Sequence, residues 1–548
     1  MPARFRRTAL AGAVMLVAGF GLSGCDSSAD AVDYIVDGAL PTYNTTSVVG
    51  AASGAPQAFS RVQTGFNFRG PDGQLVADRD FGTVSVMGRA PLTLDYKIND
   101  SAVYSDGKPV TCDDMVLAWA AQSGQFPAFD AASRAGYSDV AVVDCTPGQK
   151  RARVTFVRDR DITDYGQLFA ATSLLPAHVL DDTLGLGDGG VTKALQSGDA
   201  PTIDRIAEAW NTTWDLKPDA DLKRFPSAGP YKLASVAKDG SITLAANDKW
   251  WGAKPVIGKI TVSPRGADIV SRIQSGKVEV VDIAAGVIGK GDIPASYVRK
   301  DSASDDIQQL IFAAQGALAD PGMRRAVALC TPRDAIAAAV GVYVSNARLN
   351  TASDDSLAVA ENVDASGQFG AADVDGARAA ANNQPLTVRI GYRGPDARLA
   401  SAVAAMTKSC AAAGITVQEV ASPTVSAQSL RANDIDVLLS GGGGAAGSSS
   451  SGSSVVDSYA LHSGNGNNLS GYANERVDGV IAALAVTTDP KEQARLLGEG
   501  AGVLWGDVPT LPLYRQQRTL LVTKDLTLVR ANPTRWGAGW NMDRWGSK

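Results

Sequence analysis

The sequence predicts an α/β protein built from two or three packed units. The chain has 548 residues, 45% of them hydrophobic, so it is longer than one core supports and has ample apolar surface to bury. Residues 386–420 follow a strand, helix, strand pattern, which is typical of a parallel sheet covered by helices. Residues 92–119 have the pattern of a strand, a tight turn and a capped helix. Together these patterns favour an α/β fold.

The strand–helix–strand unit lies in the C-terminal half of the chain. Residues 386–392 form the first expected strand, and apolar residues recur at helical spacing through 396–413 until Gly414 ends the helix. Residues 415–420 and 434–439 are expected to add two further strands. Another helix is expected to begin near Thr331, with Thr331 as its cap and Pro332 in the first turn.

The N-terminal half begins with a strand whose side chains alternate between apolar and polar, at 92–98. A turn follows at 103–110, with Asp106 and Gly107 at its tip. Thr111 then caps a helix, and Asp114, three residues later, can accept a hydrogen bond from the Thr111 amide, which is the capping-box arrangement.

Residues 1–25 have the pattern of a cleaved export signal. Three arginines precede an apolar run of about a dozen residues, which is too short to cross a bilayer. The segment ends in Leu-Ser-Gly-Cys, which resembles the bacterial lipobox, in which the cysteine is acylated and becomes the first mature residue. Cys25 is therefore the predicted lipidation site, carrying palmitate or a similar chain, and residues 26–32 are the tether. We expect a lipid-anchored protein at the extracytoplasmic face of the cell membrane; an ordinary secretory peptide with a chance cysteine is the alternative.

Charge and cysteine content narrow the function classes. The formal net charge is −6 and no basic cluster occurs, which argues against a nucleic-acid partner. Four cysteines remain beside Cys25, and in an oxidising compartment an even count favours disulfides. Of the three possible pairings, sequence neighbourhood favours Cys112–Cys145 and Cys330–Cys410. No metal site is predicted, because no Cys-x-x-Cys spacing occurs and the chain has only two histidines.

Six short motifs occur in a fixed order along the chain. They are Tyr-Ser-Asp-Gly-Lys-Pro-Val-Thr-Cys-Asp-Asp at 104–114, Ser-Ala-Gly-Pro-Tyr-Lys-Leu at 227–233, Asn-Asp-Lys-Trp-Trp-Gly at 247–252, a helix–Ser-Gly–strand unit at 267–282, Met-Arg-Arg-Ala-Val-Ala-Leu at 323–329 and Pro-Thr-Leu-Pro-Leu-Tyr at 509–514. In this order they resemble family 5 extracytoplasmic solute-binding proteins, the dipeptide, oligopeptide and nickel receptors of ABC importers. Each motif is weak alone, but the six together span essentially the whole chain after the signal.

The resemblance implies a two-lobe periplasmic-binding-protein-like fold (type II, cluster C), with a discontinuous lobe I and a ligand cleft between the lobes. The expected bounds are 33–300 for lobe I, with a subdomain at about 55–220, 301–514 for lobe II, and 515–548 for a segment that returns to lobe I. Crossings near 285–305 and 512–520 are expected to act as the hinge, and closure about them would bury the ligand.

The resemblance also implies cleft residues. In peptide-binding relatives, the neighbourhood of the Gly/Ser-rich run at 440–454 carries a Trp and an Asp, and the Asp holds the peptide's α-ammonium. The run here has neither, and Asp457 is the nearest carboxylate. The run, which includes Gly441 and Gly442, is either a cleft wall of amides and hydroxyls or a surface loop. The other expected cleft residues, for which turn or core packing is the alternative, are Tyr43, Asn44, Ser53, Gly54, Asn467, Asn468 and Tyr472.

No nucleophile–base pair, zinc-protease motif or phosphate loop is visible, so the sequence predicts no enzyme, no catalytic residue and no cofactor. The resemblance predicts a membrane-anchored, monomeric receptor that binds short peptides or peptide-like solutes and serves separate permease and ATPase subunits. One alternative is a regulatory or scaffold lipoprotein without a ligand. Another is a haem receptor, in which His462 would be the axial ligand because His178 is expected to pack in the interior.

Overall fold

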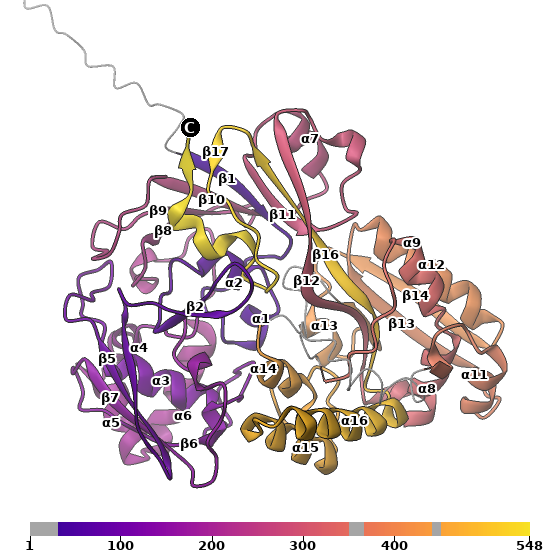
Figure 1. The fold of residues 1–548 in the computed structure, drawn as a ribbon, viewed down its shortest axis with the longest axis horizontal. Coiled ribbons are helices and arrows are strands. Elements are labelled where there is room, and N and C mark those ends of the chain that lie inside the picture. Colours follow the sequence, from indigo (N-terminus) through magenta and orange to yellow (C-terminus); the bar gives the residue numbers. More distant parts are fainter. Residues whose placement is uncertain (1–30, 350–366, 441–450) are drawn as a thin grey trace, which may run out of the picture.

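The fold is organised around a ten-stranded mixed sheet that passes through both halves of the molecule (Figure 1). The computed structural model describes residues 31–349, 367–440 and 451–548. In sheet order the strands are β14 (Ile415–Ser422), β13 (Leu386–Arg393), β15 (Val437–Ser440), β12 (Tyr297–Phe312), β16 (Thr510–Thr523), β11 (Val280–Ala284), β1 (Ala31–Val36), β10 (Lys259–Pro264), β9 (Ile242–Ala246) and β8 (Tyr231–Val236).

Two long strands, β12 and β16, connect the two halves of this sheet. They pair antiparallel along most of their length, with a register shift between Ala303 and Ile307 and another between Gln308 and Gln309. Strand β16 pairs with β11 on one side, and β12 pairs with β15 on the other. Figure 1 shows both strands running together from the end near α7 (Ile269–Gln274) toward α8 (Pro321–Cys330). The irregular pairing therefore lies between the two halves, where local bending is easiest.

Each half of the sheet has its own hydrophobic core, and the two cores define two lobes. The lobe I core includes Tyr34, Trp210 and Trp545, so the last residues of the chain pack with its first strand. The lobe II core includes Val388, Met406 and Trp505. The predicted α/β architecture with two lobes and a discontinuous lobe I is confirmed. The bound predicted at residues 300 and 301 lies inside β12, a strand that both lobes share.

Lobe I carries a second, four-stranded sheet in the order β4-β5-β7-β6, with helices beside it (Figure 1). Its capping box is present, because the Thr111 N–H donates to Asp114 Oδ2 at 3.2 Å. The Cys112–Cys145 disulfide joins the first residue of α3 to the residue that follows β6. The elements are β4 (Gly82–Arg89), β5 (Leu92–Ile98), β6 (Val140–Asp144), β7 (Arg151–Phe156), α3 (Cys112–Gln122), α4 (Ala177–Leu184), α5 (Gly190–Ser197) and α6 (Ala200–Thr212).

Lobe I also contains two short helices and two separate pairs of short strands. Helices α1 (Val48–Ala51) and α2 (Ala55–Phe59) follow β1, and β2 (Asn67–Arg69) forms a short hairpin with β3 (Leu75–Ala77). Strands β17 (Leu526–Thr527) and β18 (Gly546–Ser547) pair near the end of the chain.

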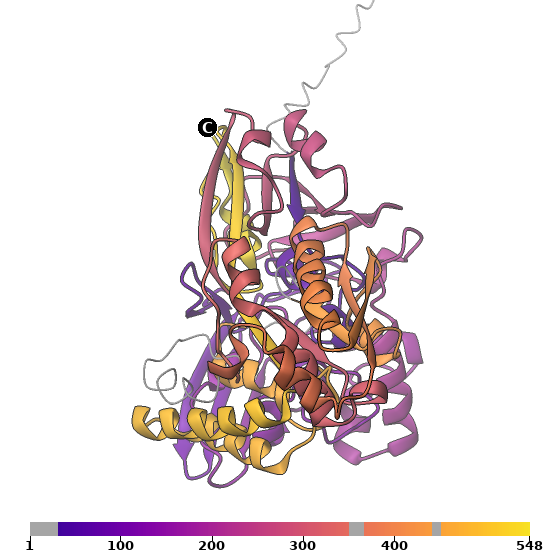
Figure 2. The ribbon, with the colours of Figure 1, turned by 90° about the vertical axis from the view of Figure 1, so that its right-hand side faces the viewer.

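Lobe II contains the predicted strand–helix–strand unit. Strand β13 pairs in parallel with both β14 and β15, and α12 (Ala397–Ala411) connects β13 to β14. The Cys330–Cys410 disulfide joins α8 to α12, so both predicted disulfides are present. Figure 2 shows these helices on the face turned toward the viewer. The remaining helices of this lobe are α9 (Arg333–Ala339), α11 (Val374–Ala380), α13 (Ala427–Arg431), α14 (Ser454–Ser458), α15 (Glu475–Val486) and α16 (Pro490–Asp507).

Two elements predicted in lobe II are present but begin later than expected. The strand expected at 434–439 is present as β15 and begins at Val437. The preceding Asp436 contacts Arg389 through its carboxylate and through its backbone N–H, which donates to the Arg389 carbonyl oxygen at 3.0 Å. Helix α9 has Pro332 as its N-cap residue. The Thr331 hydroxyl donates instead to the Val327 carbonyl of the preceding helix.

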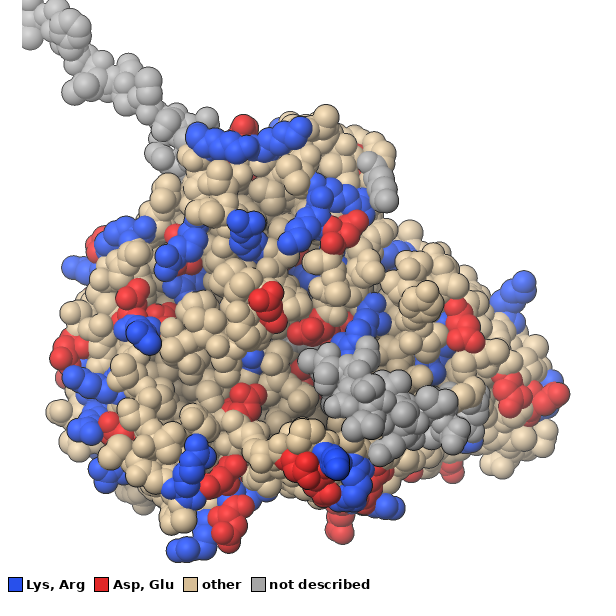
Figure 3. Space-filling model, in the orientation of Figure 1, with Lys and Arg blue, Asp and Glu red and all other residues tan. Residues whose placement is uncertain are grey.

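In the described residues, no helix is long and apolar enough to cross a membrane. The predicted signal, Cys25 and most of the tether lie outside those residues. On the face drawn in Figure 3, acidic and basic side chains are interspersed.

Candidate functional site: the interface between the lobes

The two lobes contact each other directly as well as through β12 and β16. Val48 of α1 packs in one apolar cluster with Leu438 and Leu469 of lobe II. The Asn467 backbone N–H donates to the Ala132 carbonyl oxygen at 2.7 Å. Such contacts indicate a closed arrangement of the lobes, and cavities remain enclosed at the interface.

The smaller cavity, which we call the arginine cavity, has a volume of about 80 Å³. Lobe I, lobe II and the segment that returns to lobe I all contribute to its wall. Its charged and aromatic wall residues are Arg69, Tyr137, Arg535, Trp536, Phe68 and Trp540, and lobe II contributes Ser451 and Val456.

The two arginines of this cavity are held by local structure. Arg69 is the last residue of β2, and its Nη1 donates to the Gly73 carbonyl across the hairpin at 2.8 Å. From lobe II, Gly452 packs so closely that a Cβ there would lie 3.0 Å from Arg69 Cζ. The Arg535 guanidinium stacks over the Trp536 ring at 4.7 Å, and Trp536 Nε1 donates to Thr172 Oγ1. Residues from three distant parts of the chain therefore meet here.

Desolvation dominates the electrostatics around the arginine cavity. Burial lowers the pKa of both Arg69 and Arg535. Burial raises the pKa of Asp457 to about 7, and its Oδ1 accepts the Ser451 N–H at 3.1 Å. Burial also raises the pKa of Asp164. A group of ionisable residues shifted by burial at an interface is typical of binding sites, although structural ion-pair networks show it too.

The larger cavity, which we call the latch cavity, has a volume of about 390 Å³. Ser53 and the segment after β1 form one side, and Val425 and Leu438 belong to the lobe II side. Several charged residues also line it: Asp37, Arg265, Arg393, Asp396 and Arg398.

Charged contacts across the latch cavity join the two lobes. Arg265 Nε of lobe I lies 2.6 Å from Asp37 Oδ1, and its Nη2 lies 3.5 Å from Asp396 Oδ2 of lobe II. In the opposite direction, Arg393 of lobe II donates to the Asp37 carbonyl oxygen at 3.2 Å. Burial disfavours the charged form of Asp37, but the Arg265 guanidinium, the Ala284 N–H and the charge of Arg398 together outweigh it and lower the pKa of that carboxyl. We call Asp37, Arg265, Arg393 and Asp396 the interlobe tie.

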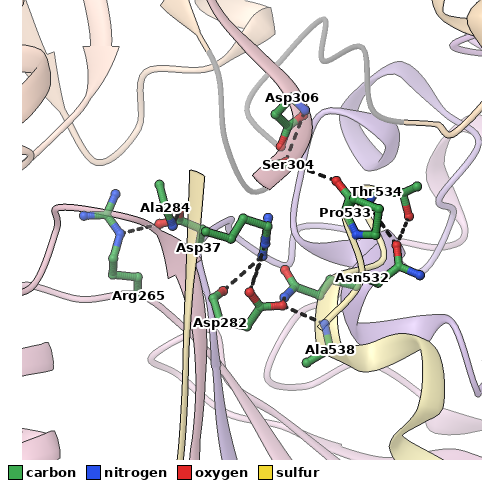
Figure 4. Close-up of polar contacts among 12 residues, drawn as sticks. Asp37, Arg265, Asp282, Ala284, Ser304, Asp306, Asn532, Pro533, Thr534 and Ala538 are labelled. Carbon is green, nitrogen blue, oxygen red and sulfur yellow. Dashed lines mark hydrogen bonds and ion pairs between the residues drawn. The ribbon is translucent and has the colours of Figure 1, made fainter. Parts of the chain in front are cut away.

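A second group of polar contacts lies where β11 and β16 meet the return segment (Figure 4). Asp282 Oδ1 lies 2.9 Å from Arg518, while its Oδ2 accepts the Ala538 N–H at 2.6 Å. The Ser304 hydroxyl donates to the Pro533 carbonyl oxygen at 3.1 Å. These bonds fasten residues 533–538 to the sheet, which places Arg535 and Trp536 at the arginine cavity.

The predicted lobe I residues lie around α1 and α2. Tyr43 is buried in the lobe I core, where its hydroxyl donates to the Pro226 carbonyl at 3.0 Å. Asn44 Oδ1 accepts the backbone N–H of Ser47, just before α1. Ser53 lines the latch cavity, and neighbouring Gly54 packs where a Cβ would lie 2.9 Å from the Gly38 carbonyl oxygen. Among these four, Ser53 is the residue that lines one of the two interlobe cavities, whereas Tyr43 lines a small pocket inside lobe I.

The predicted lobe II residues have different surroundings. Gly441 and Gly442 lie outside the described residues, and Asp457 lies one residue beyond the cavity-lining Val456. Asn467 contacts lobe I through its backbone, as described above. The Asn468 side chain donates to the Tyr472 carbonyl at 2.7 Å, and the Tyr472 hydroxyl donates to Asp507 at 2.6 Å. The side chains of Asn468 and Tyr472 therefore make hydrogen bonds within lobe II.

The two histidines are not near the cavities described above. The His462 ring stacks on Tyr459 with a centroid distance of 5.0 Å, and its Nδ1 lies 2.9 Å from the Ser463 carbonyl oxygen. His178 Nε2 lies 2.9 Å from an Asp106 carboxylate oxygen. In the described part of the chain, neither ring lines the arginine cavity or the latch cavity.

The arginines of both cavities were not predicted from sequence. Arg69 and Arg265 are single arginines beside turns, and nothing in their spacing distinguishes them. Arg535 lies in a segment rich in aromatic residues, with Trp536, Trp540 and Trp545. That cluster of arginine and tryptophan near the end of the chain is the one signal that could have marked the segment as more than structural.

Comparison with known proteins agrees with the two-lobe arrangement. The model of the bacterial extracellular solute-binding proteins, family 5 (middle), matches residues 90–460. The chain belongs to this family. Family 5 members bind solutes outside the cytoplasm, and the predicted family resemblance is confirmed.

Relatives and solved structures cover almost the whole chain. An uncharacterized lipoprotein of Mycobacterium tuberculosis, Rv2585c, is 57% identical over 99% of both chains. The oligopeptide-binding protein AppA of Bacillus subtilis, solved with a nonapeptide, has a TM-score of 0.74 at 13% identity and covers 94% of this chain and 99% of its own. The periplasmic EDTA-binding protein EppA has a TM-score of 0.71 at 18% identity, with 94% and 96% covered. At these identities the structural likeness establishes the fold.

Proposed function

We propose that this chain is a lipid-anchored receptor at the extracytoplasmic face of the cell membrane, where it captures a small solute for an ABC importer. The observation that carries the proposal is the pair of cavities enclosed between two lobes that β12 and β16 connect. Membership in family 5 and relatives named as lipoproteins support it. Cys25 is the attachment point for lipid, and the permease and ATPase are separate proteins.

Within this proposal the solute is a short peptide or a peptide-like compound. AppA, whose fold this chain shares, was solved with a nonapeptide. The protein works as a binding protein and not as an enzyme, and it acts as a monomer. The lobes close on the solute by bending near Ala303–Ile307, where the pairing of the two connecting strands is irregular.

Thermal shift and an uptake assay test the proposal together. A solute that binds only the folded protein must raise its melting temperature by mass action, so pools of short peptides are expected to raise it. Deleting the gene is expected to reduce uptake of the same labelled peptides, and restoring the wild-type gene is expected to recover it. If no peptide, haem or metal chelate binds, a regulatory lipoprotein without a ligand replaces this proposal.

A further inference from the structure

Two arginines of the arginine cavity have guanidinium nitrogens without a hydrogen-bond partner. Arg69 Nη1 donates a hydrogen bond to the Gly73 carbonyl oxygen, but its buried Nε and Nη2 have no acceptor among the described residues. The buried Nε of Arg535 has none there either. Only 6% of Arg69 is exposed. In the described part of the chain neither arginine is within ion-pair distance of a carboxylate, although Asp457 acts electrostatically on both of them and Asp164 acts on Arg69.

A purely structural role explains this arrangement poorly. A buried cation that no carboxylate contacts is unfavourable when its hydrogen-bond donors are only partly satisfied, because the protein does not fully replace its hydration. The buried Arg333 differs, because all three of its guanidinium nitrogens donate: to the carbonyl oxygens of Pro512 and Ser345 at 2.7 and 2.6 Å and to that of Phe369 at 3.4 Å. Arg518 also has one buried nitrogen without a partner, Nη1, but its guanidinium lies 2.9 Å from the Asp282 carboxylate. Arg69 and Arg535 differ because their free donors line a cavity between lobes that are expected to move.

The cavity offers an oxyanion both charge and shape. The guanidinium group is a planar fork of donors that matches carboxylate and phosphate oxygens. Phe68, Tyr137, Trp536 and Trp540 supply apolar and aromatic surface beside it. The volume of about 80 Å³ exceeds the roughly 10–15 Å³ that one water needs, so an anionic group and a short stem fit, but not a whole peptide.

We infer that the arginine cavity binds an anionic group of the captured solute, a carboxylate or a phosphate, through Arg69 and Arg535. This inference rests on the proposed receptor function and names the chemical class that the receptor selects. Because Arg69 belongs to lobe I and Ser451 and Gly452 close the cavity from lobe II, the anion is enclosed only when the lobes are closed. The solute is therefore an organic acid, with the remainder of the molecule bound along the same interface.

The test uses small probes that contain only the proposed group. N-acetylglycine and inorganic phosphate are titrated at constant ionic strength, with N-acetylglycinamide as the uncharged match, and melting temperature and calorimetric affinity are measured. We expect at least one anion to raise the melting temperature of the wild-type protein, whereas the amide leaves it unchanged. N-acetylglycine reports a carboxylate site, and phosphate reports a phosphate site.

Variants locate the binding. Arg69→Met and Arg535→Met are expected to weaken anion affinity at least tenfold. Arg530→Met removes an exposed arginine of the same segment and is expected to bind as the wild type does. Equal affinity in all four proteins would mean a non-specific anion effect and would overturn the inference, as would equal affinity for acid and amide.

Conservative variants guard against loss of folding. Arg69→Lys and Arg535→Lys keep the positive charge but lose the planar fork, so we expect anion affinity about three- to tenfold below wild type with an unchanged circular dichroism spectrum. If the Met variants do not fold, unchanged anion affinity in both Lys variants overturns the inference. If neutral peptides bind tightly and the arginine substitutions leave that affinity unchanged, the anion-site inference is overturned while the proposed receptor function stands. If anions bind through the two arginines but the deletion strain has no uptake defect, the proposed importer function is overturned while the anion site stands.

Discussion

Replacing Asp396 by Asn tests whether the interlobe tie holds the lobes closed. Asp396 lies 3.5 Å from Arg265 of lobe I, and its side chain is 1% exposed. It also caps α12 by accepting the backbone N–H of Arg398 and Leu399. Asparagine is about as good an N-cap as aspartate, so Asp396→Asn removes the charge and preserves the helix start.

The expected loss of free energy in the closed state follows from the distances of Arg265 to Asp396 and to Asp37. Opposite charges 3.5 Å apart attract by about 5 kcal/mol at an effective dielectric constant of about 20, before desolvation is counted. Arg265 keeps Asp37 at 2.6 Å in the variant. Arg398 loses its partner carboxylate, 2.8 Å away in the wild type, but this pair lies within lobe II and is lost in the open and the closed state alike, so it does not enter the closed-to-open ratio. We therefore expect the closed state to lose only about 1–2 kcal/mol, which lowers the closed-to-open ratio about 5- to 30-fold.

The assay measures lobe separation in solution. Fluorescence energy transfer between labels at the exposed Ser271 in α7 and Lys408 in α12 reports on the distance between the lobes, and small-angle scattering gives the radius of gyration. Asp396→Asn is expected to increase the open fraction and to weaken solute binding by the same factor. Asp375→Asn, which breaks an exposed ion pair with Arg378 inside α11, is the matched control. If Asp396→Asn and Asp375→Asn both behave like the wild type, the tie does not control closure.

Four further predictions concern anchoring, stability and ligand choice. Cys25→Ala is expected to release a folded, soluble protein in detergent phase partitioning, and retention in the detergent phase would contradict the lipobox. Replacing Cys112 and Cys145 together by Ser is expected to lower the free energy of unfolding by about 3–4 kcal/mol in urea, because the bond closes a loop with a sequence separation of 33; a loss below about 1 kcal/mol would contradict this. N-acetylated peptides are expected to bind at least as tightly as free peptides in calorimetry, since residues 441–454 contain no carboxylate, and a strong preference for the free amine would assign the ammonium to Asp457. Asp457 has a pKa of about 7 in the folded protein, so it keeps a proton that an unfolded Asp loses near pH 4, and the free energy of unfolding should fall as pH rises from about 4 to 7. Denaturation at pH 5 and pH 8 should show a smaller fall for Asp457→Asn than for the wild type. An equal fall in both proteins would disprove the assignment.

The fold could be predicted from sequence where local chemistry specifies it. The capping box of Thr111 and Asp114, the stop at Gly414 and both disulfides depend on residues whose local preference and tertiary role agree. The strand predicted at 434–439 is present but begins at Val437, and the partner of the preceding Asp436 is Arg389, a residue 47 positions earlier in the chain. No local pattern contains such a partner.

The site was harder to predict than the fold, because its residues come from distant segments. Arg69 and Arg535 lie far apart in sequence, and their proximity depends on the contacts that fasten residues 533–538 to the sheet. Asn468 and Tyr472 were predicted at the cleft from the family resemblance of their segment and from their polarity, yet their hydrogen bonds stay within lobe II. Polarity alone does not separate a ligand-binding side chain from one that satisfies a turn.

The place of the last residues beside the first strand has a consequence for how the protein is made. Strand β1 lies between β10 and β11, and its Tyr34 packs edge-on against Trp545 at 5.3 Å. About 500 residues are therefore synthesised between Tyr34 and Trp545, which pack in the same lobe I core. Lobe II consists of nearly continuous chain and can pack as soon as it is synthesised, but lobe I stays incomplete until β16 and residues 533–545 arrive. A chain that stops before residue 545 leaves the surface around β1, including Tyr34, without the partner that covers it in the complete fold.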